Sequence, residues 1–273
     1  MKVFRTNLFQ ALGGRSFLLA ALGTVLALVS ANFEMLLLVF RAGGGPMEAG
    51  FLLLFLQEAL SSDTMALVLP IVAALPFTTS YFDDLHSGFI KTYLPRCGYR
   101  NYIAGKLTAC ALSGGLACVV GVIGFFALSA LVFLPRISYL GSLTAFSSEI
   151  GWMLKSCMLL FFTGSYWSLV GMTAAALTNS KHMAYATPFI FFYVLVILSE
   201  RYFKGLPFLN PKVWMDPATE IWGIALLLIM SVSVSLAFIH SAGRRLRNLL
   251  RRLNRHFPWL DTISASGTKI PAL

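Results

Sequence analysis

The stretch that decides the fold is residues 81–106, YFDDLHSGFIKTYLPRCGYRNYIAGK, a charged segment between two long apolar ones. Four of its apolar residues recur at helical spacing: Phe82, Leu85, Phe89 and Tyr93. Polar residues occupy most of the opposite side, so the pattern predicts an amphipathic helix that lies flat at a membrane surface. Pro95 is expected to end this helix, because proline removes a backbone donor and restricts the residue before it.

The charges of this stretch divide into an acidic start and a basic end. Asp83 and Asp84 lie in the predicted first turn, where the helix dipole favours negative charge. Arg96, Arg100 and Lys106 follow as a basic turn that leads back into the next apolar segment. A short charged helix between two spans, facing the cytoplasm, is a surface on which a partner protein can act. This is the central functional hypothesis.

The overall composition indicates a membrane protein. The 273 residues are 58% hydrophobic and only 12% charged, whereas soluble domains carry about 25% charged residues. Several apolar runs reach the roughly 20 residues that a helix needs to cross a bilayer. We therefore predict an all-α integral membrane protein with a single domain over residues 1–273. The net charge of +10 is concentrated beside the apolar runs, which indicates topology rather than nucleic-acid binding.

The apolar runs predict six transmembrane helices. They are expected near residues 16–33, 64–80, 107–134, 156–178, 183–199 and 221–240. A basic amphipathic segment, residues 1–15, is predicted to lie on the membrane surface before the first span. We expect this span to be retained as an anchor, because its apolar run is longer than that of a signal peptide. Residues 51–60 fit either a re-entrant or interfacial helix or the start of a long second span.

The distribution of Lys and Arg predicts that both ends of the chain are cytoplasmic. Of the 21 such residues, three lie in residues 1–15, four in 81–106, one in 179–182 and seven in the basic tail 244–273. With these segments inside, only six basic residues remain outside, as the positive-inside rule requires. The tail continues the last span as a basic amphipathic helix suited to anionic lipid or to a partner subunit.

No motif in the sequence has the spacing of a catalytic, metal or nucleotide site. The GxxxxGK[ST] loop is absent, so we expect the chain to bind no ATP of its own. The cysteines lack metal-ligand spacing: Cys97, Cys110, Cys118 and Cys157. Ser165 and His240 lie on spans four and six, as in rhomboid-type proteases, but in the wrong sequence context. We predict no catalytic residues, cofactor or metal, and hence no enzyme.

The order of features around residues 81–106 resembles the permease subunit of ABC-2 type ATP-binding-cassette exporters. In that class an acidic residue after span two is followed by a glycine, a short helix, a basic turn and a lysine before span three. The matching residues here are Asp83, Asp84, Gly88, Phe89 to Leu94, Arg96, Arg100, Tyr102 and Lys106. This sequence has aspartates where the class has glutamate.

The resemblance implies a partner and a mode of action. The segment 81–106 would be a coupling helix that docks on a separate ATP-binding-cassette ATPase, which binds the ATP and Mg. The residues implied at this interface are Asp83, Asp84, His86, Gly88, Phe89, Lys91, Tyr93, Leu94, Arg96 and Arg100. Two permeases, identical or different, would pair in the bacterial plasma membrane and export an unidentified drug, antimicrobial peptide or lipid-like molecule.

Two other functions are compatible with the sequence. A membrane scaffold or sensor would use the charged segment to bind a soluble partner without transport. A secondary transporter would usually show paired repeats and intramembrane charges near the bilayer midplane, and we see neither in the sequence.

Overall fold

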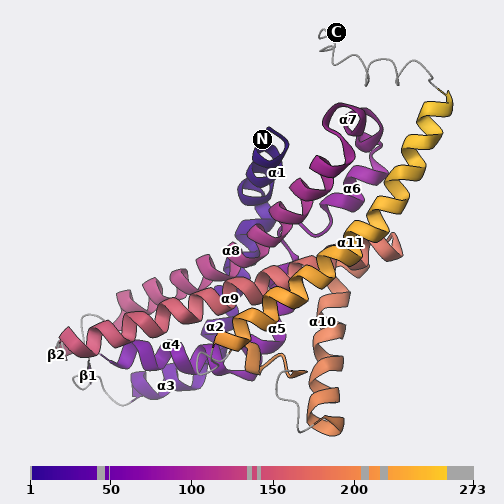
Figure 1. Cartoon of the computed structure of the whole chain (residues 1–273). Coiled ribbons are helices and arrows are strands. Elements are labelled where there is room, and N and C mark those ends of the chain that lie inside the picture. Colours follow the sequence, from indigo (N-terminus) through magenta and orange to yellow (C-terminus); the bar gives the residue numbers. More distant parts are fainter. Residues whose placement is uncertain are drawn as a thin grey trace.

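The computed structural model describes residues 2–41, 47–48, 50–133, 137–139, 143–203, 209–215 and 221–256. This part of the chain is built almost entirely of helices, so the predicted all-α class is confirmed (Figure 1). The helices are α1 (Lys2–Gly13), α2 (Arg15–Ala31), α3 (Phe33–Arg41), α4 (Phe51–Ser61), α5 (Asp63–Ala74), α6 (Ser80–His86), α7 (Phe89–Cys97), α8 (Tyr99–Phe133), α9 (Leu143–Thr178), α10 (Lys181–Ile197) and α11 (Ile221–His256).

Three kinds of short element complete the described part. A π-helical turn, η2 (Leu198–Tyr202), extends α10, and a 3₁₀ turn, η4 (Val213–Met215), precedes α11. Two very short strands, β1 (Met47–Glu48) and β2 (Ile137–Tyr139), pair in parallel. They join the connection after α3 to the connection after α8.

The described helices include between four and six membrane spans. Four are long and apolar enough on their own: Tyr99–Phe133, Gly151–Thr178, Lys181–Tyr202 and Gly223–Leu246. Two further spans result if each of two bent pairs is counted as one, Phe4–Gly13 with Arg15–Ala31, bent by 50°, and Phe51–Ser61 with Asp63–Ala74, bent by 70°. The chain thus has the helices of a multi-pass membrane protein, and predicted spans three to six correspond to single helices.

The second bent pair shows how residues 51–60 are used. The Ser62 hydroxyl accepts a hydrogen bond of 3.1 Å from the Met65 backbone N–H and so caps the start of α5. With a bend of 70° at this cap, α4 is one arm of a broken span or a re-entrant segment, not a straight extension of span two. It packs on α8, where the Phe55 ring lies 5.6 Å from that of Phe125 and 5.3 Å from that of Phe133, between centroids.

The N-terminal segment that is predicted to be helical forms α1, which ends at Gly13. It packs against α8, so both Ala11 and Asn7 are buried. The burial of Asn7 was not expected, because the sequence pattern places it on the polar side of α1. Its Nδ2 has no hydrogen-bond partner among the described residues.

Helix α9 is the centre of the fold. Most of its apolar span is buried, whereas only a small share of the apolar span of α11 is buried. Hydroxyl groups of α9 hold α8 closely: Ser165 Oγ donates to the Ala111 carbonyl at 2.8 Å, and Ser168 Oγ donates to the Cys110 carbonyl at 3.0 Å. Short hydroxyl side chains therefore serve helix packing here.

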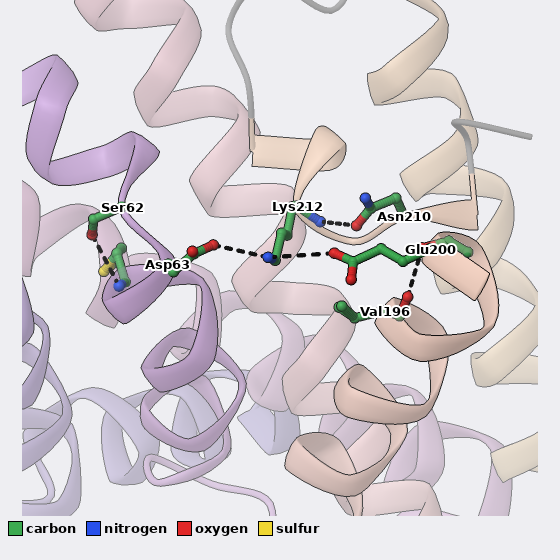
Figure 2. A network of polar contacts seen from close by, with 8 residues as sticks. Ser62, Asp63, Val196, Glu200, Asn210 and Lys212 are labelled. Atoms are coloured by element: carbon green, nitrogen blue, oxygen red, sulfur yellow. Dashed lines mark hydrogen bonds and ion pairs between the residues drawn. The ribbon is translucent and has the colours of Figure 1, made fainter. Parts of the chain in front are cut away.

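An ion-pair network ties the start of α5 to η2, the turn that extends α10 (Figure 2). Lys212 Nζ lies 2.9 Å from Asp63 Oδ1 and 3.5 Å from Glu200 Oε1. The backbone N–H of Lys212 donates to Asn210 Oδ1 at 3.1 Å, which fixes the loop that carries the lysine. The loop before η4 is thereby held against two spans.

Because of this network, the stability of the chain is expected to fall at alkaline pH. The hydrogen bond to Asp63 raises the pKa of Lys212 above its ordinary value of 10.5; partial burial opposes this and the two carboxylate charges add to it. Since the folded chain holds this proton more tightly, the ion pairs stabilise the fold at pH values below 10.5 and are lost as the pH rises above it.

We expect the variant Lys212→Gln to unfold about 1–3 °C below the wild type near neutral pH, because exposed ion pairs contribute little. The difference should shrink at a strongly alkaline pH, above the raised pKa of Lys212, where the wild-type lysine has lost its charge. Thermal unfolding of the purified chain at both pH values measures this. An equal difference at the two pH values would show that the lysine acts through packing instead.

Candidate functional site

Residues 81–106 form two short helices and the first turns of α8, not one amphipathic helix. Helix α6 ends at His86 and α7 begins at Phe89, and between them Gly88 has a φ of +74°, which glycine adopts without a Cβ clash. Helix α7 continues through Pro95 to Cys97 and ends at Gly98, whose φ is also +74°. The prediction that Pro95 ends a single helix is therefore wrong.

Figure 1 shows α6 and α7 at the same end of the molecule as α1 and the last turns of α11, far from α3 and α4. We call this end the α6–α7 end. Its apolar core contains the buried side chains of Tyr81, Ile90 and Leu94, which pack in one cluster with Phe238 and Leu246 of α11. The two short helices are therefore packed onto the spans.

The buried side of α6 and α7 is not the predicted apolar stripe. Phe89, a member of that stripe, is 48% exposed. The other members are only partly buried: Phe82, Leu85 and Tyr93. The left-handed turn at Gly88 changes the direction of the chain, so helical spacing counted across it does not keep residues on one face.

A nearly dehydrated ion pair joins α6 to α8. Lys106 Nζ lies 2.8 Å from Asp84 Oδ2, and the Tyr102 hydroxyl donates to the same oxygen at 2.7 Å. The side chain of Lys106 is 3% exposed and that of Asp84 is 20% exposed. The ammonium also lies 3.5 Å from the Ser80 carbonyl oxygen and 4.9 Å from the centroid of the Phe77 ring. These contacts attach α6 to the first turns of α8, the helix that forms span three.

The neighbouring carboxylate of α6 reaches a different span. Asp83 Oδ1 lies 3.2 Å from the Nζ of Lys181, the first residue of α10, and both side chains are half exposed. Beside it, Arg245 of α11 donates to the Leu177 carbonyl at 3.1 Å and to Asn179 Oδ1 at 3.3 Å. The ion pairs of α6 thus connect it to the first turns of α8 and α10, and Arg245 connects α11 to the end of α9.

Tyr81 is a core residue of this site that lies outside the predicted apolar stripe. Its ring meets that of Phe238 edge-on, with 5.3 Å between centroids, and its hydroxyl has no hydrogen-bond partner among the described residues. Burial raises the pKa of Tyr81 to about 12, although the charge of Arg245 lowers it slightly. Tyr81 is therefore neutral at physiological pH and contributes by packing.

The residues implied at a partner interface differ in their accessibility. Asp83, His86, Phe89 and Arg100 are exposed, and Gly88 and Tyr93 are partly buried. The side chains of Lys91 and Arg96 lie outside the described residues. Leu94 is a core residue that a docked partner cannot reach, so its place on the predicted surface is corrected. Asp84 is engaged by Lys106, and its role lies within the chain.

The pairing of Asp84 with Lys106 was not predicted, although a signal existed for it. A lysine inside the first turns of an apolar helix is costly unless a partner neutralises it, and Asp84 is the nearest carboxylate upstream along the chain. The described residues contain no group of three or more His, Cys, Asp or Glu side chains placed to hold a metal ion.

Comparison of the chain with known protein families, with curated proteins and with solved structures gives no match. Its function is therefore inferred from the residues and contacts described above.

Proposed function

We propose that the chain is the membrane-spanning permease subunit of an ABC-2 type ATP-binding-cassette exporter in a bacterial plasma membrane. Helices α6 and α7 face the cytoplasm and form the coupling element for a separate ATPase subunit, which binds ATP and Mg. A second permease completes the translocation path for a drug, an antimicrobial peptide or a lipid-like molecule. The observation that carries this proposal is the ion pair of Asp84 with the buried Lys106, which ties α6 to a membrane span.

The α6–α7 end has the contacts needed to transmit a push from a partner. Movement of α6 acts on α8 through Asp84 and on α10 through Asp83. Movement of α7 acts on α11, because Ile90 and Leu94 share an apolar cluster with residues of that helix. Three spans therefore respond to a displacement of these two short helices.

The same end also offers aromatic side chains suited to a docking cleft. The Phe89 and Tyr93 rings stack with 4.9 Å between their centroids, and the Phe82 and His86 rings lie 4.1 Å apart. Aromatic residues are over-represented among the residues that dominate binding energy at protein interfaces. Phe89 is the more exposed of the first pair, so we assign it the central contact with the ATPase.

The test is co-purification of the tagged full chain from its native cells in a mild detergent, with mass spectrometry of what co-purifies. We expect a stoichiometric ATPase with a GxxxxGK[ST] loop, and we expect Phe89→Asp to lose it. Phe203→Asp is the matched control, because Phe203 is 45% exposed but follows η2, at the opposite end of α10 from Lys181, the residue that contacts α6.

Each variant must first elute as a monodisperse species, which shows that the chain is folded. If the folded wild type brings down no ATPase, or if Phe89→Asp keeps it at the wild-type level, the permease proposal fails. The scaffold, sensor and secondary-transporter functions would then take its place.

A further inference from the structure

Helix α11 continues well past the membrane span that it contains. The candidate span is Gly223–Leu246, whereas the helix runs without a break to His256. Residues 247–256 therefore add about 15 Å along the axis, at about 1.5 Å per residue. The headgroup layer beside the hydrocarbon core is only about 5–8 Å thick. Even at a tilt of about 40° these residues reach about 11 Å, so the last turns of α11 stand beyond the headgroups.

The direction in which this extension leaves the membrane is fixed by contacts at its base. Leu246 is fully buried in the apolar cluster that contains α7, and Arg245 donates to the Leu177 carbonyl and to Asn179 Oδ1. An amphipathic helix that binds lipid lies in the plane of the membrane, which requires the chain to turn away from its span. Helix α11 has no break at which to turn, and Figure 1 shows its last turns apart from α6 and α7.

The extension is amphipathic, with a leucine face and an arginine face. Because α11 is helical to His256, its register fixes which residues share a face. Leu249, Leu250 and Leu253 fall within about 60° of Leu246 around the axis, so they continue the buried stripe by one and two turns. Six arginines fall at least about 100° away from Leu246: Arg244, Arg245, Arg247, Arg251, Arg252 and Arg255. Residues 221–256 contain no Asp or Glu.

These two faces together indicate what binds the extension. Anionic headgroups reach only its first turn. A nucleic acid supplies phosphates for the arginines but no apolar groove for the leucines. A protein groove with an apolar floor and a rim of carboxylates matches both faces. Helices that dock in such grooves carry anchors at i, i+3, i+4 and i+7, which is the spacing of the leucines counted from Leu246.

We propose that residues 247–256 dock, as a helix, in the apolar groove of a soluble protein whose rim carries Asp and Glu side chains. The leucine face enters the groove and the arginines pair with its rim. This contact is made beyond the headgroups, on the same side of the membrane as the α6–α7 end. It requires no ATPase and is independent of the proposed permease function.

Binding of calmodulin to the full chain in lipid nanodiscs tests this surface. Calmodulin is an acidic protein whose apolar groove opens only when it binds Ca²⁺, so it serves as a probe of helix docking. We expect binding with Ca²⁺ and at least about tenfold weaker binding without it. The affinity should be the same in nanodiscs of neutral lipid and in nanodiscs rich in phosphatidylglycerol, because the last turns stand beyond the headgroups.

Two variants with the same change of charge separate docking from simple attraction between charges. Leu250→Asp places a carboxylate on the leucine face and should weaken binding at least about tenfold. Asn248→Asp places it on the arginine face and should weaken binding less than about threefold. Each variant must first elute as a monodisperse species.

Three results would overturn the proposal. Equal binding with and without Ca²⁺, or equal loss in the two variants, would show attraction between charges only. Loss of binding in the anionic nanodiscs would show that lipid covers the leucine face. No binding of the wild-type chain under any of these conditions would show that this face is closed to a soluble partner, whether by the chain itself or by a second copy.

Discussion

Replacing Asp84 with alanine should lower the free energy of unfolding by about 3–5 kcal/mol, because it leaves a buried ammonium without its counter-charge. Lys106 cannot turn to solvent at 3% exposure. Its remaining neighbours, the Ser80 carbonyl and the Phe77 ring, carry only partial charge. The effect is measured as the temperature at which the detergent-solubilised chain loses its monodisperse elution peak.

Two further variants distinguish the ion pair from simple packing. Asp84→Leu combined with Lys106→Met removes both charges and should recover most of the lost stability. Asp83→Ala removes the neighbouring, half-exposed carboxylate and should cost less than about 1 kcal/mol. If the double variant is as unstable as Asp84→Ala, the loss comes from the shape of the side chains and not from the unpaired charge.

Replacing Gly115 with alanine should destabilise the contact between α8 and α9 by about 1–3 kcal/mol. A Cβ at this position would lie 2.5 Å from the Phe161 carbonyl oxygen and 2.7 Å from a carbon of the Phe161 ring. Because the nearest atom belongs to the backbone, the two helices must move apart to accept the methyl group. The hydrogen bond from Ser165 to the Ala111 carbonyl would be stretched by the same movement. Thermal unfolding in detergent measures the effect.

Gly124→Ala is the matched control on the same helix. Its Cβ would meet only a methyl group of Val25 at 3.4 Å, an ordinary contact. The exchange should be neutral or slightly stabilising, because alanine is the better helix former. Wild-type stability of Gly115→Ala would show that α8 and α9 are not held at the distance described here.

Much of the architecture could be predicted from the sequence because hydrophobicity alone limits where spans can lie. The apolar run after Lys106 and the run that ends at Thr178 each appear as one long helix. Even the break between α4 and α5 had a local signal, since Ser62 stands before the acidic Asp63 and an apolar run, which is typical of a helix start.

The candidate site was harder to predict, for two physical reasons. The predicted apolar stripe runs from Phe82 to Phe89 across Gly88, and a left-handed turn at this glycine leaves no trace in the apolar pattern. Pro95 was a strong signal of a helix end, yet α7 continues two residues beyond it. The pairing of Asp84 with Lys106 joins two helices, so no rule for neighbours on one helix could have found it.

The two adjacent aspartates of α6 give this short helix attachments of unequal stiffness. The Asp84 attachment to α8 is shielded from solvent, so dissolved ions barely weaken it. The Asp83 attachment to α10 is open to solvent and is weakened as ionic strength rises. In the proposed coupling function, a displaced α6 would therefore move α8 with it more rigidly than α10, because the link through Asp83 is the weaker of the two.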